Sequence, residues 1–331
     1  MSMKLRVLIS APYMLPEIGR FQAVFDEAGL EVIVADIDER LEERELLEYA
    51  GHIDGAICGD DRFSRKVLEA AAPRLKVISK WGTGIDSIDE RTAERLQIQV
   101  FNTPGAFTEA VADTVLGYML SFARGLPWMD RAMKSGNWEK RRAHALHELT
   151  LGVIGVGRIG RAVLMRAAAF GMRLFGNDIV KVDTEFVESI GVRMVSLEEL
   201  LRASDYVSLH CDLNPTSRGL INQERLRMMV EGGILINTAR GPVVEEAALI
   251  EALQSGRLNG AALDVFEVEP LSDGSPLRRM ESVLLAPHNA NSSESAWEKV
   301  HWTSLRNLFR GLGLEVPEVV ELNLRSGARM D

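Results

Sequence analysis

Short apolar runs alternate with helical patterns along almost the whole chain. In the first hundred residues the runs that read as strands are residues 4–10, 31–36, 54–58, 75–81 and 97–103. Helical periodicity fills the intervals between them. Parallel strands are joined by crossovers that are usually helical and right-handed. The alternation therefore predicts an α/β fold with a mostly parallel, doubly wound sheet and helices on both faces.

A second series of the same kind follows a long helical stretch that begins after Gly105. Its strand candidates are residues 151–157, 172–178, 206–211, 234–239, 261–266 and 282–287, and a last helix begins near Ser293. A chain of 331 residues has room for two domains of about 150 residues each. We therefore expect two doubly wound parallel-sheet domains.

Composition excludes several classes of protein. Apolar residues make up 46% of the chain, enough to build a core and to exclude disorder as the main state. No apolar run approaches the ~20 residues of a membrane span, and the chain opens directly on a strand pattern, so we expect neither a membrane protein nor a secreted one. The net charge of −10 is spread widely, which argues against a nucleic-acid surface but not against small anions. Cys58 and Cys211 make no disulfide framework, so we expect a cytoplasmic protein.

One glycine pattern indicates a dinucleotide cofactor. Gly155, Gly157 and Gly160 form a GxGxxG motif between a strand and a helix pattern, and Asp178 ends the next strand. The glycines permit a tight turn, close approach of a pyrophosphate and close packing of helix on strand, while the helix dipole attracts the anion. Asp178 would accept hydrogen bonds from ribose hydroxyls and repel a 2′-phosphate, which predicts NAD rather than NADP. A glycine-rich turn that binds nothing is the alternative, and the combined context favours the cofactor.

Three polar residues stand at the ends of late strands, where doubly wound sheets bind ligands. They are Arg240, Glu269 and His288. Each alone has an ordinary structural interpretation as a surface or loop charge. Together they supply a planar cation for a carboxylate, an acid/base that titrates near neutrality, and a carboxylate that stabilises the imidazolium. This set suits the reduction of a 2-keto acid.

Seven motifs in this order and spacing resemble the D-isomer-specific 2-hydroxyacid dehydrogenases, the family of phosphoglycerate, D-lactate, glyoxylate and formate dehydrogenases. They occupy residues 80–89, 101–113, 155–160, 209–222, 236–241, 262–270 and 287–288. The resemblance implies an NAD-dependent oxidoreductase that interconverts a D-2-hydroxy acid and its 2-keto acid by hydride transfer. In it His288 is the general acid/base, Glu269 its partner, and Arg240 orients the substrate.

The same resemblance assigns the remaining site residues. Asp264 would hold the nicotinamide carboxamide, and the other cofactor contacts would come from Gly155, Gly157, Arg158, Ile159, Gly160, Asp178, Cys211, Ser217, Thr238 and Ala239. The backbone of Thr83 and Gly84 would bind the substrate carboxylate, because glycine leaves N–H groups accessible. Lys80 would hold an anion as a point charge where phosphoglycerate enzymes usually carry arginine, and Trp81 would narrow or flatten the substrate site.

The family's architecture also implies how the domains follow one another. A Rossmann NAD-binding domain, residues 102–288, is inserted into a flavodoxin-like substrate domain made of residues 1–101 and 289–331. The stretch from Gly105 to about Leu149 resembles the arm through which the family forms homodimers, and packing within its own domain is the alternative. The chain ends at Asp331 without the regulatory domain of longer phosphoglycerate dehydrogenases, so serine feedback is not expected.

Several histidines and serines have an ordinary structural interpretation or two open interpretations. His210 is read as a buried structural histidine, and Ser292 and Ser293 either cap the last helix or present hydroxyls to substrate. His144 and His147 lack a third ligand nearby, so no metal is expected. The alternative function is a non-catalytic, dimeric NAD(H)-sensing binding protein on the same fold.

Overall fold

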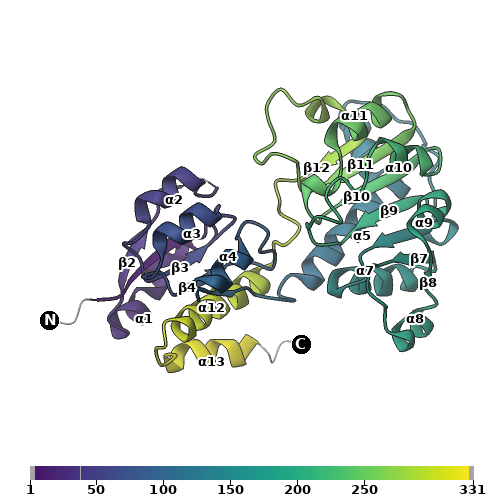
Figure 1. The fold of residues 1–331 in the computed structure, drawn as a ribbon. Helices are drawn as coiled ribbons and strands as arrows, with labels where there is room; N and C mark the ends of the chain where they lie inside the picture. Colours follow the sequence, from purple (N-terminus) through teal and green to yellow (C-terminus); the bar gives the residue numbers. More distant parts are fainter. Residues whose placement is uncertain (1–3, 38, 328–331) are drawn as a thin grey trace. The chain divides into compact units, whose positions relative to one another are not determined.

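The computed structural model describes residues 4–37 and 39–327, and the chain divides into two compact units (Figure 1). Unit 1 is the chain up to Ala106 together with the part from Ser293 onward, and unit 2 is Phe107–Ser292. The crossings therefore lie a few residues beyond the expected 101/102 and 288/289. Residues 1–3, 38 and 328–331 of the expected substrate domain lie outside the described residues.

Unit 1 is built on a five-stranded parallel sheet in the order β2-β1-β3-β4-β5. The strands are β1 (Arg6–Ser10), β2 (Glu31–Val34), β3 (Gly55–Cys58), β4 (Val77–Lys80) and β5 (Gln99–Phe101). Each lies inside the range expected from the sequence. This is the flavodoxin-like order, in which the strand sequence reverses between β1 and β3.

Helices cover both faces of the unit 1 sheet. They are α1 (Gln22–Glu27), α2 (Glu43–Tyr49), α3 (Arg65–Ala71), α4 (Glu90–Arg95), α12 (Glu294–Gly311) and α13 (Glu318–Gly327), with the 3₁₀ helix η1 (Leu15–Phe21). Ala56 and Ile78 pack into the core beneath α2 and α3. Their neighbours Gly55 and Val77 face Leu308 and Gly311 of α12. Because side chains alternate along a strand, α12 covers the opposite face.

The start of α12 differs from the capping interpretation. Ser293 occupies the N-cap position, but its side chain makes no capping hydrogen bond. Its Oγ lies 3.3 Å from Ser295 Oγ instead. The N-cap prediction is therefore right in position and wrong in the contact.

Unit 2 has a seven-stranded parallel sheet in the order β12-β11-β10-β9-β6-β7-β8. The strands are β6 (Thr150–Ile154), β7 (Arg173–Asn177), β8 (Arg193–Met194), β9 (Tyr206–Leu209), β10 (Gly233–Asn237), β11 (Leu258–Leu263) and β12 (Val283–Leu285). The order reverses between β9 and β6, as in a Rossmann fold. The short β8 was not expected, because two residues carry no periodic signal.

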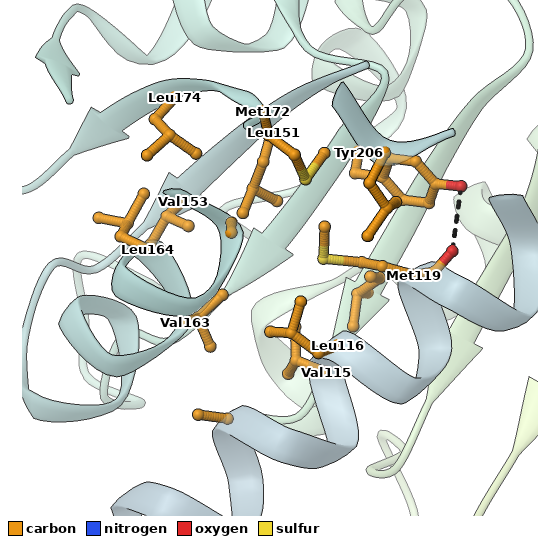
Figure 2. Close-up of a cluster of buried hydrophobic side chains, with 14 of the residues drawn as sticks. Val115, Leu116, Met119, Leu151, Val153, Val163, Leu164, Met172, Leu174 and Tyr206 are labelled. Carbon is orange, nitrogen blue, oxygen red and sulfur yellow. Dashed lines mark hydrogen bonds between the residues drawn. The ribbon is translucent and has the colours of Figure 1, made fainter. Parts of the chain in front are cut away.

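Helices α5 (Thr108–Arg124) and α7 (Arg158–Ala169) cover one face of this sheet. Figure 2 shows the core they form, with Val115, Leu116 and Met119 of α5 and Val163 and Leu164 of α7 directed at strand side chains of β6 and β7. One face of α5 therefore packs within its own domain. The other elements of unit 2 are α6 (Leu126–Lys134), η2 (Leu146–Glu148), α8 (Thr184–Ile190), α9 (Leu197–Ala203), α10 (Gln223–Met228), η3 (Gly241–Val243), α11 (Glu246–Gln254) and η4 (Pro276–Arg279).

Candidate functional site

The GxGxxG motif forms the turn between β6 and α7, and its glycines have different surroundings. Gly155 has a φ of +91°, and a Cβ added there would lie 2.6 Å from the carbonyl carbon of His210. A Cβ on Gly160 would lie 2.0 Å from the oxygen of Gly155, whereas one on Gly157 would meet nothing within 4 Å. The fold itself therefore requires Gly155 and Gly160, while Gly157 leaves open space where a ligand can approach the backbone.

A cavity of about 780 Å³ lies beside this turn. The predicted cofactor residues on its wall are Gly155, Gly157, Arg158, Asp178, Cys211 and Ser217. The predicted residues Ile159, Gly160, Thr238, Ala239 and Asp264 are not among the described residues that line it. The wall also includes residues that the sequence analysis did not select, namely Arg161, Lys181, Asn214, Thr216 and Arg225. Arg161 directly follows the glycine motif, and Asn214 and Thr216 lie within the motif at residues 209–222, whereas Lys181 and Arg225 lie outside the quoted motifs.

Asp178 connects the end of β7 to the glycine turn. Its Oδ2 accepts a hydrogen bond of 2.7 Å from Val156 N, and its Oδ1 accepts one of 2.9 Å from Val180 N. Two backbone donors hold the carboxylate in one orientation at the cavity wall. A carboxylate oxygen has two acceptor positions, so each can still receive a hydroxyl donor.

The segment after β10 is held by Asn237, which the sequence analysis missed. Asn237 Oδ1 accepts from Ala239 N, and its Nδ2 donates to Arg240 O, each at 3.0 Å. Thr238 Oγ1, between them in the chain, is buried with no hydrogen-bond partner among the described residues. A buried hydroxyl without a partner fits a ligand that brings one.

Two other predicted positions are engaged in local structure. Ser217 Oγ donates to Asp212 O at 2.5 Å and accepts from Asn214 N at 2.9 Å, so it fixes the turn after β9. His210 lines the cavity, with Nε2 at 2.8 Å from Ser208 Oγ. Burial lowers the pKa of His210 to about 3, which keeps the ring neutral and agrees with the structural interpretation over that of a second acid/base.

His288 and Glu269 form a pair in unit 2. His288 Nδ1 lies 2.9 Å from Glu269 Oε2, and the two side chains are 22% and 20% exposed. The other oxygen, Glu269 Oε1, accepts from Phe266 N at 2.9 Å. A carboxylate acceptor places the imidazole proton on Nδ1, which leaves Nε2 as the ring atom directed away from Glu269.

Asp264 holds the backbone that carries His288. His288 has a φ of +50°, in the left-handed region that a side chain disfavours. Its N–H donates to Asp264 O, and the next two N–H groups, of Asn289 and Ala290, donate to the Asp264 carboxylate at 2.8 and 2.9 Å. Burial raises the pKa of Asp264, and these two N–H donors act against that shift. The sequence analysis missed this positioning role.

Neighbouring strands bring the predicted catalytic residues to one edge of the unit 2 sheet. Arg240 follows β10, Asp264 follows β11 and His288 follows β12, and these three strands are adjacent and parallel. Their carboxyl ends therefore meet at the same edge. Arg240 is extended there, and its side chain donates to Ala239 O at 2.9 Å. A planar cation, an imidazole and a carboxylate thus lie at one sheet edge, which is the equipment for acid/base chemistry on a carboxylate-bearing substrate.

The predicted substrate residues lie in unit 1. The Gly82–Gly84 turn after β4 is fixed by Asn102 Nδ2, which donates to Thr83 O at 2.6 Å, and by Thr103 N, which donates to Gly82 O at 2.9 Å. The N–H groups of Thr83 and Gly84 have no acceptor within the described part of the chain. Lys80 Nζ lies 2.8 Å from Asp60 Oδ1, with its side chain 4% exposed. Its charge is thus already balanced by a carboxylate.

Comparison with known proteins agrees with this geometry. The sequence model of the D-isomer specific 2-hydroxyacid dehydrogenase NAD binding domain matches residues 116–290, which lie within unit 2. The chain belongs to the D-isomer specific 2-hydroxyacid dehydrogenase family. It is similar to the glyoxylate reductase of Korarchaeum cryptofilum, with 38% identity over 78% of this chain and 79% of the relative. It is also similar to the hydroxypyruvate reductase of Thermotoga maritima, with 36% identity over 88% and 94% of the two chains.

Solved structures of the family share the fold. The D-lactate dehydrogenase from Aquifex aeolicus, complexed with NAD and lactic acid, superposes with a TM-score of 0.79 at 28% identity and covers 98% of this chain and 96% of its own. The predicted family, two-domain α/β fold and enzyme class are confirmed. As a family member, the protein is an NAD(P)-dependent oxidoreductase that acts on 2-hydroxy and 2-keto acids. None of the described helices has the length and apolar character to cross a bilayer.

Proposed function

We propose that this dehydrogenase reduces a 2-keto acid to the D-2-hydroxy acid with His288 as the general acid, and runs in reverse with His288 as the base. The observation that carries the proposal is the 2.9 Å contact between His288 Nδ1 and Glu269 Oε2, at the sheet edge that Arg240 shares. In reduction the proton leaves His288 Nε2 for the carbonyl oxygen at C2. Glu269 stabilises the imidazolium before that transfer and orients the ring.

Unit 2 is proposed to bind NAD. When bound, the cofactor supplies the hydride that C2 of the keto acid accepts. The open approach at Gly157 suits a pyrophosphate, and Asp178 at the cavity wall suits ribose hydroxyls and disfavours a 2′-phosphate. Thr238 and Ala239 would border the nicotinamide end, with Asp264 as the acceptor for the carboxamide. Arg158, Ile159, Cys211 and Ser217 would also contact the cofactor.

Unit 1 is proposed to bind the substrate carboxylate. The unpartnered N–H groups of Thr83 and Gly84 are two adjacent donors, a geometry that suits an anion. Arg240 would orient the substrate through its planar guanidinium, which matches a carboxylate or a keto oxygen. Lys80 would act through its pair with Asp60 rather than as a free point charge.

The test is NADH oxidation, followed at the absorbance of the reduced nicotinamide, with a panel of 2-keto acids. We expect turnover by the wild type and a loss of about 10²- to 10⁴-fold in kcat for His288→Ala, with NADH affinity retained. Equal turnover by both proteins would remove His288 from the mechanism. Tight NADH binding without turnover of any 2-keto acid would favour the non-catalytic sensor instead.

We also propose that the protein is a cytoplasmic homodimer, joined through α6 and the segment that follows it. No residue of α6 is buried, and Leu126, Met133 and Trp138 are 50%, 51% and 82% exposed. Apolar side chains this exposed on neighbouring segments are typical of a surface that a second protein chain covers. Light scattering coupled to size-exclusion chromatography should give twice the mass of one chain, and a monomer at micromolar concentration would contradict the proposal. The two cysteines are unpaired, which suits a reducing compartment.

A further inference from the structure

Three aromatic side chains meet at the carboxyl edge of the unit 1 sheet. Tyr13 follows β1, Trp81 follows β4, and Trp297 lies on α12. The ring of Tyr13 is 5.0 Å from that of Trp81 and 4.8 Å from that of Trp297, and the two indoles are 5.8 Å apart and nearly perpendicular. We call these three residues the aromatic cluster. Such spacings are those of directly packed rings.

A buried hydrogen bond holds one ring of the aromatic cluster in place, and the other two rings are partly exposed to solvent. Trp81 is 3% exposed, and its Nε1 donates to His301 Nδ1 at 3.0 Å. His301 is 1% exposed, and burial lowers its pKa, so the ring stays a neutral acceptor. Tyr13 and Trp297 are only half-buried. The aromatic cluster therefore combines a rigid base with an apolar surface that its own unit leaves partly uncovered.

Charged groups beside the aromatic cluster do not favour a substrate that carries an anionic group in addition to its carboxylate. Lys80 directly precedes Trp81, and its ammonium is paired with Asp60. Asp61, the next residue, is buried and accepts hydrogen bonds from Ser10 Oγ and Leu41 N. Among Lys80, Asp60 and Asp61, one cation stands against two carboxyl groups, so these three groups offer no surplus positive charge. A phosphate or second carboxylate on a substrate would lose hydration beside Lys80 while competing with Asp60 for its ammonium.

The position of the aromatic cluster links it to the substrate. Trp81 adjoins the Gly82–Gly84 turn, which offers the N–H groups of Thr83 and Gly84. Tyr13 and Asp60 follow β1 and β3, the strands on either side of the reversal in strand order, where open α/β sheets bind ligands. We propose that the aromatic cluster receives the substrate's side chain, so that the preferred 2-keto acid carries a branched or aromatic apolar tail. This inference rests on the proposed function and adds the substrate class to it.

The first test compares kcat/KM for 2-keto acids that share a head group and differ in tail. Glyoxylate has no tail, pyruvate a methyl, 4-methyl-2-oxopentanoate a branched chain and phenylpyruvate a ring, while oxaloacetate and 3-phosphohydroxypyruvate carry a second anion. One of the two apolar-tailed acids should exceed glyoxylate by at least about tenfold, since each buried methylene discriminates by about 10- to 200-fold. The two acids with a second anion should rank below pyruvate.

The second test changes the aromatic cluster and measures the ratio of two kcat/KM values. A general loss of folded or active enzyme lowers both values and leaves their ratio unchanged. Trp297→Ala should lower the ratio of kcat/KM for the best apolar-tailed acid to that for glyoxylate by about tenfold, mainly through KM. Trp302→Phe is the matched control, because Trp302 lies on the same helix but packs on Phe21 and donates to Glu298. Its ratio should stay within about twofold of wild type, below the smallest discrimination of a methylene.

His301 supplies a third measurement as a positioning residue. His301→Asn keeps an acceptor near the place of Nδ1, and His301→Leu removes it. If His301 acts by holding Trp81, His301→Leu should lower the ratio of kcat/KM for the apolar-tailed acid to that for glyoxylate, and His301→Asn should retain most of the wild-type ratio.

The outcomes separate this inference from the function on which it rests. Fastest turnover of glyoxylate, oxaloacetate or 3-phosphohydroxypyruvate would overturn the apolar-tail inference and leave the dehydrogenase proposal standing. An unchanged ratio in Trp297→Ala would also overturn it. Absence of turnover with every acid would overturn the proposed function, and the inference with it.

Discussion

The two units carry parallel sheets of related design but hold their polar groups in different ways. In unit 2, Asp178 and Asp264 each receive two backbone N–H groups, so main chain fixes the carboxylates. In unit 1, side chains do much of this work, as in the pairs Lys80–Asp60 and Trp81–His301. Backbone donors stay in place when a neighbouring side chain changes. A side-chain substitution nearby should therefore disturb Asp178 and Asp264 less than it disturbs the pairs of Lys80 and Trp81.

This difference agrees with the roles proposed for the units. A nicotinamide cofactor has the same shape in every enzyme that uses it, so a site built from main chain serves it well. A substrate tail differs from enzyme to enzyme, and single side-chain substitutions can follow it.

Backbone crowding in unit 2 predicts the largest effect. Gly160→Ala brings a Cβ to 2.0 Å from the oxygen of Gly155, so we expect a loss of about 3 kcal/mol or more in the free energy of unfolding. Gly157→Ala meets no neighbouring atom, so stability should stay within about 0.5 kcal/mol of wild type while NADH binding is lost. Urea unfolding and NADH fluorescence titration measure the two quantities. Normal NADH affinity in Gly157→Ala would contradict the close backbone approach.

A buried carboxyl in unit 1 predicts an effect of similar size that depends on pH. Burial raises the pKa of Asp61 from 3.8 to about 6, and a shift of that size corresponds to about 3 kcal/mol. Because the folded pKa is the higher one, the contribution to stability is fully present below pH 3.8 and is lost as pH rises through 6. Relative to Asp61→Asn, the wild type should lose stability over this range.

Urea unfolding at several pH values from 4 to 8 tests this prediction. The exposed carboxyl of Asp26, changed to Asn, provides the control. A difference between wild type and Asp61→Asn that does not change with pH would show that Asp61 ionises as it does in the unfolded chain.

The two backbone hydrogen bonds that the Asp264 carboxylate accepts predict the smallest of the three effects. Asp264→Asn replaces one acceptor oxygen by an amide N–H that faces a backbone N–H of Asn289 or Ala290. We expect a loss of about 1–3 kcal/mol in the free energy of unfolding, together with a lower kcat, because the segment that carries His288 is released. Asp113→Asn, an exposed acid of the same unit that pairs with Arg166, is the control. Wild-type stability and kcat in Asp264→Asn would contradict the positioning role.

Residues predicted from the sequence lie close together where neighbours in the chain or successive strands carry them. The glycine turn and Asp178 belong to one βαβ segment, and the residues that follow β10 and β12 reach one edge because parallel strands align their carboxyl ends. The sequence analysis missed Asn237, whose contacts are only two and three residues away, because asparagine at a strand end has many ordinary uses. It also treated Lys80 as a free charge, since its partner lies in a different loop.

The alternation of strands and helices and the glycine turn can be read from the sequence, which also predicts His288 and Glu269, whose side chains lie in contact. These depend on periodicity and on short motifs, which act through local backbone geometry. Tertiary contacts alone reveal which charges are already paired, how Asp264 supports the strained backbone at His288, and that Tyr13, Trp81 and Trp297 form one surface. Those contacts join segments tens to hundreds of residues apart, and packing of the whole fold is what brings them within reach.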